Sequence, residues 1–180
     1  MAKKPEPKAT EDFIINYSEV QPKVPGLKLN IGCGDTHMDG FINVDLYNKS
    51  ADALWNAKSL PLNDNSVSLI LSYQTIEHFN HEEVPSILKE WFRVLKPKGE
   101  VHLNTPDIIT SCELVVKNPD RIWYLSRIFG NQSHEGQYHR WGYSMSELSN
   151  LFGMTGFLSV TTADYINVDG TRFIYLKAIK

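Results

Sequence analysis

Short stretches rich in apolar residues, separated by glycine, proline and polar residues, recur along the first 106 residues. Strands that are buried on both faces of a parallel sheet produce stretches of this length and composition. They lie at residues 28–31, 41–44, 51–54, 67–72 and 101–105. The pattern therefore predicts five strands, the last of which ends at Pro106.

Between the fourth and fifth stretches the apolar period changes to that of a helix. Asn80 or His81 is a suitable N-cap, and two glutamates follow in the first turn, where the helix dipole favours acidic groups. The apolar residues that would share one helical face are Ile87, Leu88, Trp91, Phe92 and Leu95. We expect this helix to pack against the sheet and to be stopped by Gly99.

The C-terminal part has weaker patterns. Residues 108–116 and 120–129 have helical character, and Ser144 with Glu147 matches a capping box that begins a helix running to Phe152. The closing strands, which would pair as a hairpin at one edge of the sheet, are residues 157–161 and 173–179.

The chain has 180 residues, which is the length of one domain. Residues 1–24 begin with a stretch rich in lysine, proline and glutamate, so we expect an N-terminal arm that is partly disordered. Residues 25–180 would form a single domain.

The chemistry that the sequence suggests centres on Gly32, Gly34 and Asp45. Two glycines around one small residue allow a tight turn, and their missing Cβ atoms let a ligand approach the main chain. Asp45 follows the second strand, and in an open α/β sheet this position faces the ligand crevice. A carboxylate there suits the two hydroxyls of a ribose, so the stretch predicts a ligand that contains a nucleoside.

A dinucleotide fits the same stretch poorly. The dinucleotide motif has a third glycine where this chain has His37, and its acid comes about 20 residues later, much further along than Asp45. Asp35 would also repel a pyrophosphate. These residues favour a ligand without phosphates.

Several ordered motifs resemble those of class I S-adenosylmethionine-dependent methyltransferases, in particular a subgroup of small methyltransferase domains. The motifs are residues 30–34 (Asn-Ile-Gly-Cys-Gly), 43–45 (Asn-Val-Asp), 59–66, 76–79 (Ile-Glu-His-Phe) and 95–100. The resemblance covers residues 27–106 well and the remainder loosely. It implies an α/β fold with a doubly wound, mostly parallel seven-stranded sheet, in which the loop at 35–40 replaces the first crossover helix.

The resemblance also implies that S-adenosyl-L-methionine is the cofactor. Gly32, Cys33 and Gly34 would line its methionine part. Asp45 would accept hydrogen bonds from its ribose, and Leu46 would pack beside its adenine.

Four further residues are expected near the cofactor. Asn56 and Ala57 stand where the family commonly has Asp-Ala at the adenine edge, and an amide can still bond to that edge. Tyr73 and Gln74 end the fourth strand and would lie near the methyl group. A loop cap for Asn56 and a plain core position for Tyr73 are the alternatives.

The polar and aromatic loop at 133–143 is the candidate acceptor site, with a bland surface loop as the alternative. His139 is the first candidate for a general base, and His78 is the second, although the pair Glu77-His78 also suits a structural role. The residues that would shape the acceptor pocket are Tyr138, Arg140 and Trp141.

No metal is expected from the sequence. The histidine pairs that lie close in sequence, His78 with His81 and His134 with His139, have no set of cysteines or carboxylates at metal-ligand spacing. The chain has two cysteines, with neither metal-site nor disulfide-framework spacing, which indicates a reducing, cytoplasmic location.

The charge and hydropathy exclude some partners. The net charge of −3 disfavours a broad nucleic-acid footprint, which normally requires a basic face. No apolar run approaches the roughly 20 residues that cross a bilayer, and no signal peptide is evident. The expected partner is a small-molecule or glycan acceptor, the glycan being suggested by the resemblance alone.

The favoured function is therefore methyl transfer from S-adenosylmethionine to a small-molecule or sugar-type acceptor. Protein and RNA acceptors stay open, whereas DNA amino-methyltransferases carry an Asp/Asn-Pro-Pro-aromatic segment where this chain has residues 72–75. The alternatives are a non-catalytic binding module that keeps the pocket and, less favoured, an oxidoreductase built on the same sheet.

Overall fold

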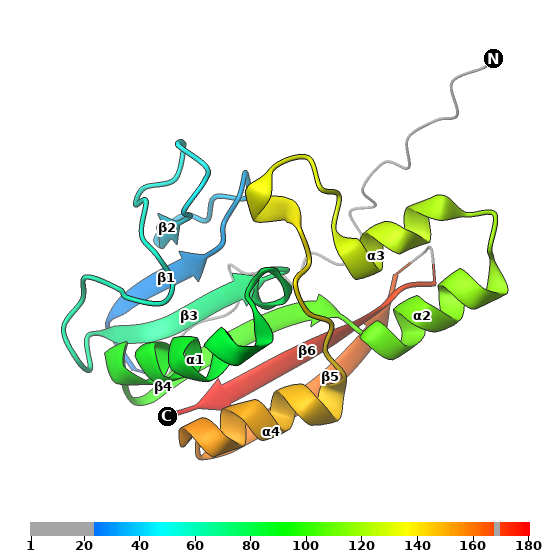
Figure 1. Cartoon of the computed structure of the whole chain (residues 1–180). Coiled ribbons are helices and arrows are strands. Elements are labelled where there is room, and N and C mark those ends of the chain that lie inside the picture. The colour runs from blue at the N-terminus through cyan, green and yellow to red at the C-terminus, as the bar shows by residue number, and fades with distance from the viewer. Residues whose placement is uncertain (1–23, 168–169) are drawn as a thin grey trace.

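The computed structural model describes residues 24–167 and 170–180, and its strands form one sheet (Figure 1). The strands are β1 (Leu27–Ile31), β2 (Ile42–Val44), β3 (Val67–Tyr73), β4 (Leu95–Pro106), β5 (Ser159–Ile166) and β6 (Arg172–Ile179). Their order across the sheet is β2-β1-β3-β4-β6-β5. The first four are parallel, and β6 is antiparallel to both β4 and β5. The carboxyl ends of β1, β2 and β3 therefore meet at one edge.

The predicted seven-stranded sheet was wrong for the described part of the chain, which has six strands. The expected third strand at 51–54 is reduced to one parallel bridge, between Val44 and Ala53. A side chain explains this, because the Asp52 carboxylate accepts hydrogen bonds from the backbone N–H and the side-chain amide of Asn43, both at 2.8 Å. The backbone donor that a longer strand would use is thus already occupied.

The connection between β1 and β2 contains no helix, as predicted for the loop at 35–40, and none lies between β2 and β3. Parallel neighbours usually need a longer crossover. Here the side chain of Asn43 replaces it, since its Oδ1 accepts from Met38 N (2.8 Å) and Asn30 Nδ2 (3.0 Å). The doubly wound arrangement is therefore incomplete over the described residues, because these two connections would supply its missing helices.

Helices α1 (Val84–Val94) and α4 (Met145–Thr155) pack on the same face of the sheet (Figure 1). Their buried residues, including Trp91 and Phe152, join those of β1, β3, β4 and β6 in one hydrophobic core. Of the two predicted N-caps, Asn80 and His81, Asn80 forms a capping box with Glu83 around the 3₁₀ turn η4 (His81–Glu83), whereas the N-cap of α1 itself is Glu83.

The prediction that Gly99 stops the first long helix was wrong. The α1 helix ends at Val94, and Leu95 is already extended (φ −65°, ψ 140°) at the start of β4. Pro97 explains the early end, because its ring would clash with the carbonyl four residues before it and because it disfavours a helical residue before itself.

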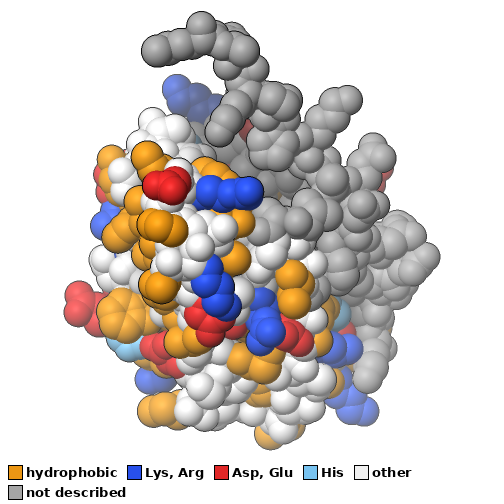
Figure 2. All heavy atoms as spheres, turned by 90° about the vertical axis from the view of Figure 1, so that its right-hand side faces the viewer, with side chains coloured by type: hydrophobic (Ala, Val, Ile, Leu, Met, Phe, Trp, Pro, Cys, Tyr) orange, Lys and Arg blue, Asp and Glu red, His pale blue; other side chains and the backbone are white. Residues whose placement is uncertain are grey.

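Three shorter helices follow β4 beyond the carboxyl end of the sheet: α2 (Ile108–Lys117), the 3₁₀ helix η5 (Ile122–Leu125) and α3 (Ser126–Phe129). The expected helix at 120–129 is thus divided into η5 and α3. Figure 2 views the molecule from this side, where hydrophobic side chains lie among charged ones. Exposed apolar residues here include Ile109, Val116, Ile122 and Phe129.

The expected closing hairpin is present as β5 and β6, although β5 begins later than predicted. The predicted arm at 1–24 falls outside the described residues except for Val24, and its division from a single domain stays a prediction. Within residues 24–167 and 170–180, no helix has the length and apolar character needed to cross a membrane.

Candidate active site

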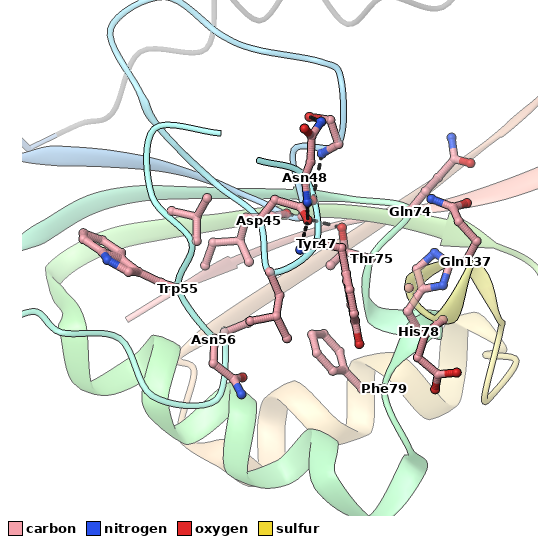
Figure 3. A pocket seen from close by; sticks show the side chains of 18 of the residues that line it. Asp45, Tyr47, Asn48, Trp55, Asn56, Gln74, Thr75, His78, Phe79 and Gln137 are labelled. Atoms are coloured by element: carbon pink, nitrogen blue, oxygen red, sulfur yellow. Dashed lines mark hydrogen bonds between the residues drawn. The ribbon is translucent and has the colours of Figure 1, made fainter. Parts of the chain in front are cut away.

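A cavity of about 750 Å³ lies at the carboxyl ends of β1, β2 and β3. Its lining comes from the loops after these strands, from residues 55–58 and from the segment around the 3₁₀ turn η6 (Glu135–Gln137). Figure 3 shows Trp55 and Asn56 on one side of this space and Gln74, His78 and Gln137 on the other. The position is the one that an open α/β sheet uses for ligands.

The two glycines after β1 have different roles. Gly32 (φ +72°) is required by packing, because a Cβ there would lie 2.2 Å from Thr75 Oγ1. Gly34 (φ +47°) also has a left-handed backbone, but a Cβ there would meet no atom within 4 Å. Only Gly34 therefore presents bare main chain with open space beside it.

Asp45 is held by backbone donors at the cavity wall (Figure 3). Its Oδ2 accepts from Gly34 N at 3.0 Å, and its Oδ1 accepts from Tyr47 N at 2.8 Å and Asn48 N at 2.9 Å. Burial raises the pKa of this carboxyl, but the backbone donors outweigh burial and hold the pKa below its ordinary value. The carboxylate is therefore ionised at neutral pH and lies on the cavity wall.

Residues 55–60 are fixed to α1 by side chains of that helix. Trp91 Nε1 donates to Ala57 O (3.2 Å), and Leu60 N donates to Glu90 Oε1 (2.7 Å). These bonds place Asn56 and Ala57 on the cavity wall. Asn56 Oδ1 accepts from Lys58 N (3.0 Å), so its amide nitrogen stays available to the cavity.

The segment around η6 covers the cavity by packing on Tyr47. A Cβ at Gly136 would lie 2.5 Å from the Tyr47 ring, and the rings of Tyr47 and His134 are 6.0 Å apart. Tyr47 is 51% exposed, so this contact lies at the outer rim of the cavity.

The 3₁₀ turn η3 (Ile76–His78) anchors the loop that follows η6. Glu77 O accepts from Arg140 N (2.7 Å) and Trp141 N (3.2 Å), and His78 Nδ1 bonds to Tyr138 O (3.0 Å). The pair Glu77-His78 thus has the structural role that the sequence offered as an alternative to catalysis.

The side chains of Glu77, His78 and His139 lie together beside the cavity. The His78 and His139 rings meet edge to face with centroids 4.9 Å apart, and His139 Nδ1 bonds to Arg127 O (3.2 Å). Burial lowers the pKa of both imidazoles, that of His139 to about 4 with the help of His78. Burial raises the pKa of Glu77 to about 7. Both rings are therefore neutral at pH 7.

The structure brings nine of the residues singled out by sequence to the cavity lining. They are Gly32, Gly34, Asp45, Leu46, Asn56, Ala57, Gln74, His78 and Arg140. Gln74 stands out because it has a left-handed backbone (φ +49°) that side chains rarely adopt, a strain typical of functional positions.

Five others do not line the cavity: Cys33, Tyr73, Tyr138, His139 and Trp141. Cys33 is buried, and burial, followed by the charge of Asp45, raises its pKa to about 11. Trp141 lies outside, where its ring stacks on His81 (centroids 4.3 Å apart) and its Nε1 donates to Glu147 Oε1 (3.0 Å). That bond leaves the predicted capping box half formed, since Ser144 Oγ still accepts from Glu147 N.

Sequence reasoning did not single out several lining residues, among them Tyr47, Asn48, Trp55, Thr75 and Phe79. Tyr47 and Asn48 lie two and three residues after Asp45, and Thr75 and Phe79 flank η3, so proximity to the motifs was a usable signal for these four. Gln137 lies in the loop at 133–143, which the sequence had indicated as a whole.

Residues 39–103 match the family model described as a methyltransferase domain. Over these residues the chain is similar to methyltransferase domains. The matched segment contains β2, β3, α1 and most of β4, and with them Asp45 and the turn η3.

One curated relative and two solved structures extend the comparison. An uncharacterized methyltransferase-like protein of Schizosaccharomyces pombe is 32% identical over 118 residues, which are 54% of this chain and 43% of that protein. The chain therefore spans less than half of the length of this relative.

The solved structures share the fold at low identity. A SAM-dependent methyltransferase from Methanosarcina mazei has a TM-score of 0.64 at 18% identity, covering 93% of this chain and 97% of that one. A Haemonchus contortus phosphoethanolamine N-methyltransferase 2, in complex with phosphomonomethylethanolamine and S-adenosylhomocysteine, has a TM-score of 0.56 at 14% identity, covering 88% of this chain and 50% of that one.

The residues of the cavity fit the cofactor of this domain family, S-adenosyl-L-methionine. Gly34 offers bare main chain, Asp45 offers an ionised carboxylate, and Leu46, Trp55 and Phe79 offer apolar surface for an aromatic ring. The cations of the lining are already used, because Lys58 pairs with Glu83 and Arg140 with Glu135. A ligand that lacks phosphates suits such a cavity.

Proposed function

We propose that this chain binds S-adenosyl-L-methionine in the cavity and transfers its methyl group to a small-molecule acceptor. The observation that carries the proposal is the pair of Gly34 and Asp45, joined by a 3.0 Å hydrogen bond on one wall of the cavity. A bare main-chain turn beside an ionised carboxylate is a site for a ribose with a polar substituent.

Different residues of the cavity would contact different parts of the cofactor. Gly32 and Gly34, with Cys33 between them, shape the turn for the amino-acid part of the cofactor, and Asp45 accepts a ribose hydroxyl. Leu46, Asn56 and Ala57 hold the adenine.

The cofactor supplies an activated methyl group on a sulfonium, so the protein has only to bind, orient and exclude water. Tyr73 ends β3 and Gln74 follows it at the place where donor and acceptor would meet, and Gln74 lines the cavity.

The acceptor is proposed to enter near η6, with Arg140 on the cavity wall and Tyr138 and Trp141 supporting the loop from outside. His78 lines the cavity and His139 lies behind it, and these two are the candidate catalytic residues. A small acceptor is supported by the size of the cavity and by the phosphomonomethylethanolamine complex of the Haemonchus contortus enzyme. A sugar-type acceptor suits the same polar lining.

Three broader points belong to the same proposal. A protein or RNA acceptor is an alternative, and a mass-detected methyl-transfer screen over small molecules, glycans, peptides and RNA would decide among them. A non-catalytic binding module is favoured by the position of His139, which lies outside the cavity. We also propose a cytoplasmic location, since Cys33 and Cys112 are both free thiols.

The decisive experiment is calorimetric titration with S-adenosylhomocysteine. Asp45→Asn should weaken binding at least about tenfold, or about 1.4 kcal/mol, because a charge-assisted bond to ribose is lost. Asp39→Asn, which changes an exposed acid that does not line the cavity, should bind as the wild type does.

Because Asp45 also accepts from three backbone N–H groups, its replacement could disturb the loop as well as the ligand contact. Asn56→Ala is the second variant, since the Asn56 side chain makes one bond to its loop, and it should also weaken the binding of S-adenosylhomocysteine. Wild-type protein that fails to bind S-adenosylhomocysteine, or that binds NAD tightly instead, would refute the proposal.

A further inference from the structure

We propose that Glu77, His78 and His139 form a binding site for one divalent transition-metal ion beside the cavity. Each of these side chains has a potential ligand atom within 4.8 Å of those of the other two. In the described residues this is the one group of three or more His, Cys, Asp or Glu side chains with such spacing. Two ligands come from η3 and the third from the loop that η3 anchors.

The hydrogen bonds of the two imidazoles prepare them as ligands. A carbonyl oxygen can only accept, so the bonds of His78 to Tyr138 O (3.0 Å) and of His139 to Arg127 O (3.2 Å) place a proton on each Nδ1. A neutral ring then has a lone pair on Nε2. Metal-binding histidines typically donate their other ring N–H to a backbone carbonyl in this way.

Glu77 supplies the independent observation. The residue is 1% exposed, and its Oε2 accepts from Thr105 Oγ1 at 3.0 Å, but Oε1 has no hydrogen-bond partner within the described chain. No lysine or arginine among these residues forms an ion pair with it. A buried carboxylate oxygen without a donor or a cation is costly, and a bound cation would remove that cost.

The donor set selects the class of metal. Two imidazoles and one carboxylate suit Zn²⁺, Fe²⁺, Mn²⁺ or Co²⁺, whereas Mg²⁺ and Ca²⁺ prefer oxygen ligands throughout. Bonds of about 2.0–2.2 Å would draw the three ligand atoms closer together than they are now. Three protein ligands leave at least one coordination position open, as in catalytic rather than structural zinc sites.

The open position would face the cavity, because His78 lines it and lies beside Gln74 and Gln137 in Figure 3. A metal there could bind a hydroxyl or carboxylate of the acceptor. The sequence offers no sign of this site, because it pairs His78 with His81 and His134 with His139. The fold instead brings His78 and His139 together.

The test uses the full chain after treatment with a chelator, titrated with Co²⁺ and followed by visible absorption. We expect one Co²⁺ per chain with bands of a low-coordinate site, and displacement by one Zn²⁺. Glu77→Gln, His78→Gln and His139→Gln should each weaken Co²⁺ binding at least about tenfold. His37→Gln removes an exposed imidazole outside the cavity and should leave binding unchanged.

Wild-type protein that binds no Co²⁺ or Zn²⁺ would overturn the inference without the need for any variant. Equal binding by the three ligand variants and the wild type would overturn it too, by assigning the ion to surface histidines. Circular dichroism checks that each variant folds. If one does not, the wild type is modified with diethylpyrocarbonate with and without Zn²⁺, and Zn²⁺ should protect His78 and His139. Lack of protection would count against the site.

The outcome is separable from that of the proposed function. The metal titration contains no S-adenosylhomocysteine, and the S-adenosylhomocysteine titration contains no metal. If His78→Gln and His139→Gln slow methyl transfer while the wild type binds no metal, the imidazoles act as bases and the metal site is rejected.

Discussion

Two buried glutamates that contact different ends of β4 have different surroundings. Glu100 on β4 is 2% exposed and accepts from His102 Nε2 (2.8 Å) and Lys177 Nζ (2.9 Å), whereas Glu77 is 1% exposed and accepts from Thr105 alone. Each has one oxygen without a hydrogen-bond partner among the described residues, but Lys177 compensates the charge of Glu100.

The pKa values follow this difference. Burial raises the pKa of Glu100, but His102 and Lys177 outweigh burial and hold the pKa below its ordinary value. Burial raises the pKa of Glu77 to about 7, because the hydrogen bonds from its own backbone N–H and from Thr105 oppose burial only in part and no cation adds to them. Glu100, which is paired with a cation of the chain, stabilises the fold. Glu77, which lies beside the cavity and has no such cation, is available to a ligand.

The largest expected effect is on stability. Glu100→Gln removes the buried carboxylate that accepts from Lys177 and His102 and should cost about 2 kcal/mol at neutral pH, because Lys177 is partly exposed and water can solvate its charge. Glu77→Gln, measured without added metal, should cost about 1 kcal/mol or less, because an amide oxygen can still accept from Thr105. Urea unfolding of both variants checks this, and equal losses would break the comparison.

The second prediction concerns another buried group on the cavity side. Because the pKa of Cys33 is raised to about 11 from an ordinary 9.0, its thiolate population at pH 8 should be about one hundredth of the ordinary one. Iodoacetamide should therefore modify the exposed Cys112 first. Peptide mapping by mass spectrometry over time measures both rates, and early modification of Cys33 would contradict the pKa.

The sequence predicted the parts of the site that depend on neighbouring residues. Gly34 and Asp45 stand at the ends of two apolar stretches, so the strand pattern alone brings them to one edge of the sheet. Local signals also placed the N-cap at Asn80.

What the sequence did not predict depends on contacts between distant segments. His139 meets Glu77 and His78 only because backbone bonds to η3 hold its loop, and no period or spacing encodes those bonds. The lost third strand has the same kind of cause, since one carboxylate, Asp52, competes for a backbone donor of β2.

A smaller effect is expected from acid. Burial lowers the pKa of His102, so its contribution to stability is full above 6.5 and falls as the pH drops toward the folded-state pKa. The lowered pKa of Glu100 makes its contribution full above 4.5 and lost as the pH falls through its folded value. Both act in the same direction.

The wild type should therefore lose stability on acidification, and its advantage over Glu100→Gln should shrink below about pH 4.5. Urea midpoints of the two proteins at neutral and acidic pH give the advantage directly. A constant advantage across this range would show that the charge of Glu100 is not what stabilises the fold.

The smallest expected effect compares two tyrosines, one in each region. The Tyr175 hydroxyl donates to His102 Nδ1 at 2.5 Å, which fits a neutral His102 whose Nε2–H donates to Glu100. Tyr175→Phe should then cost about 1 kcal/mol.

The Tyr143 hydroxyl is fully buried beside Glu77 and has no hydrogen-bond partner in residues 24–167 and 170–180, so Tyr143→Phe should cost nothing or stabilise slightly. Thermal and urea unfolding of the two variants sharpen the comparison, because the same atom is removed from a satisfied network in one and from an unsatisfied one in the other. If Tyr143→Phe proved the more harmful, the polar groups around Glu77 would be satisfied by the chain after all, and the case for a ligand there would weaken.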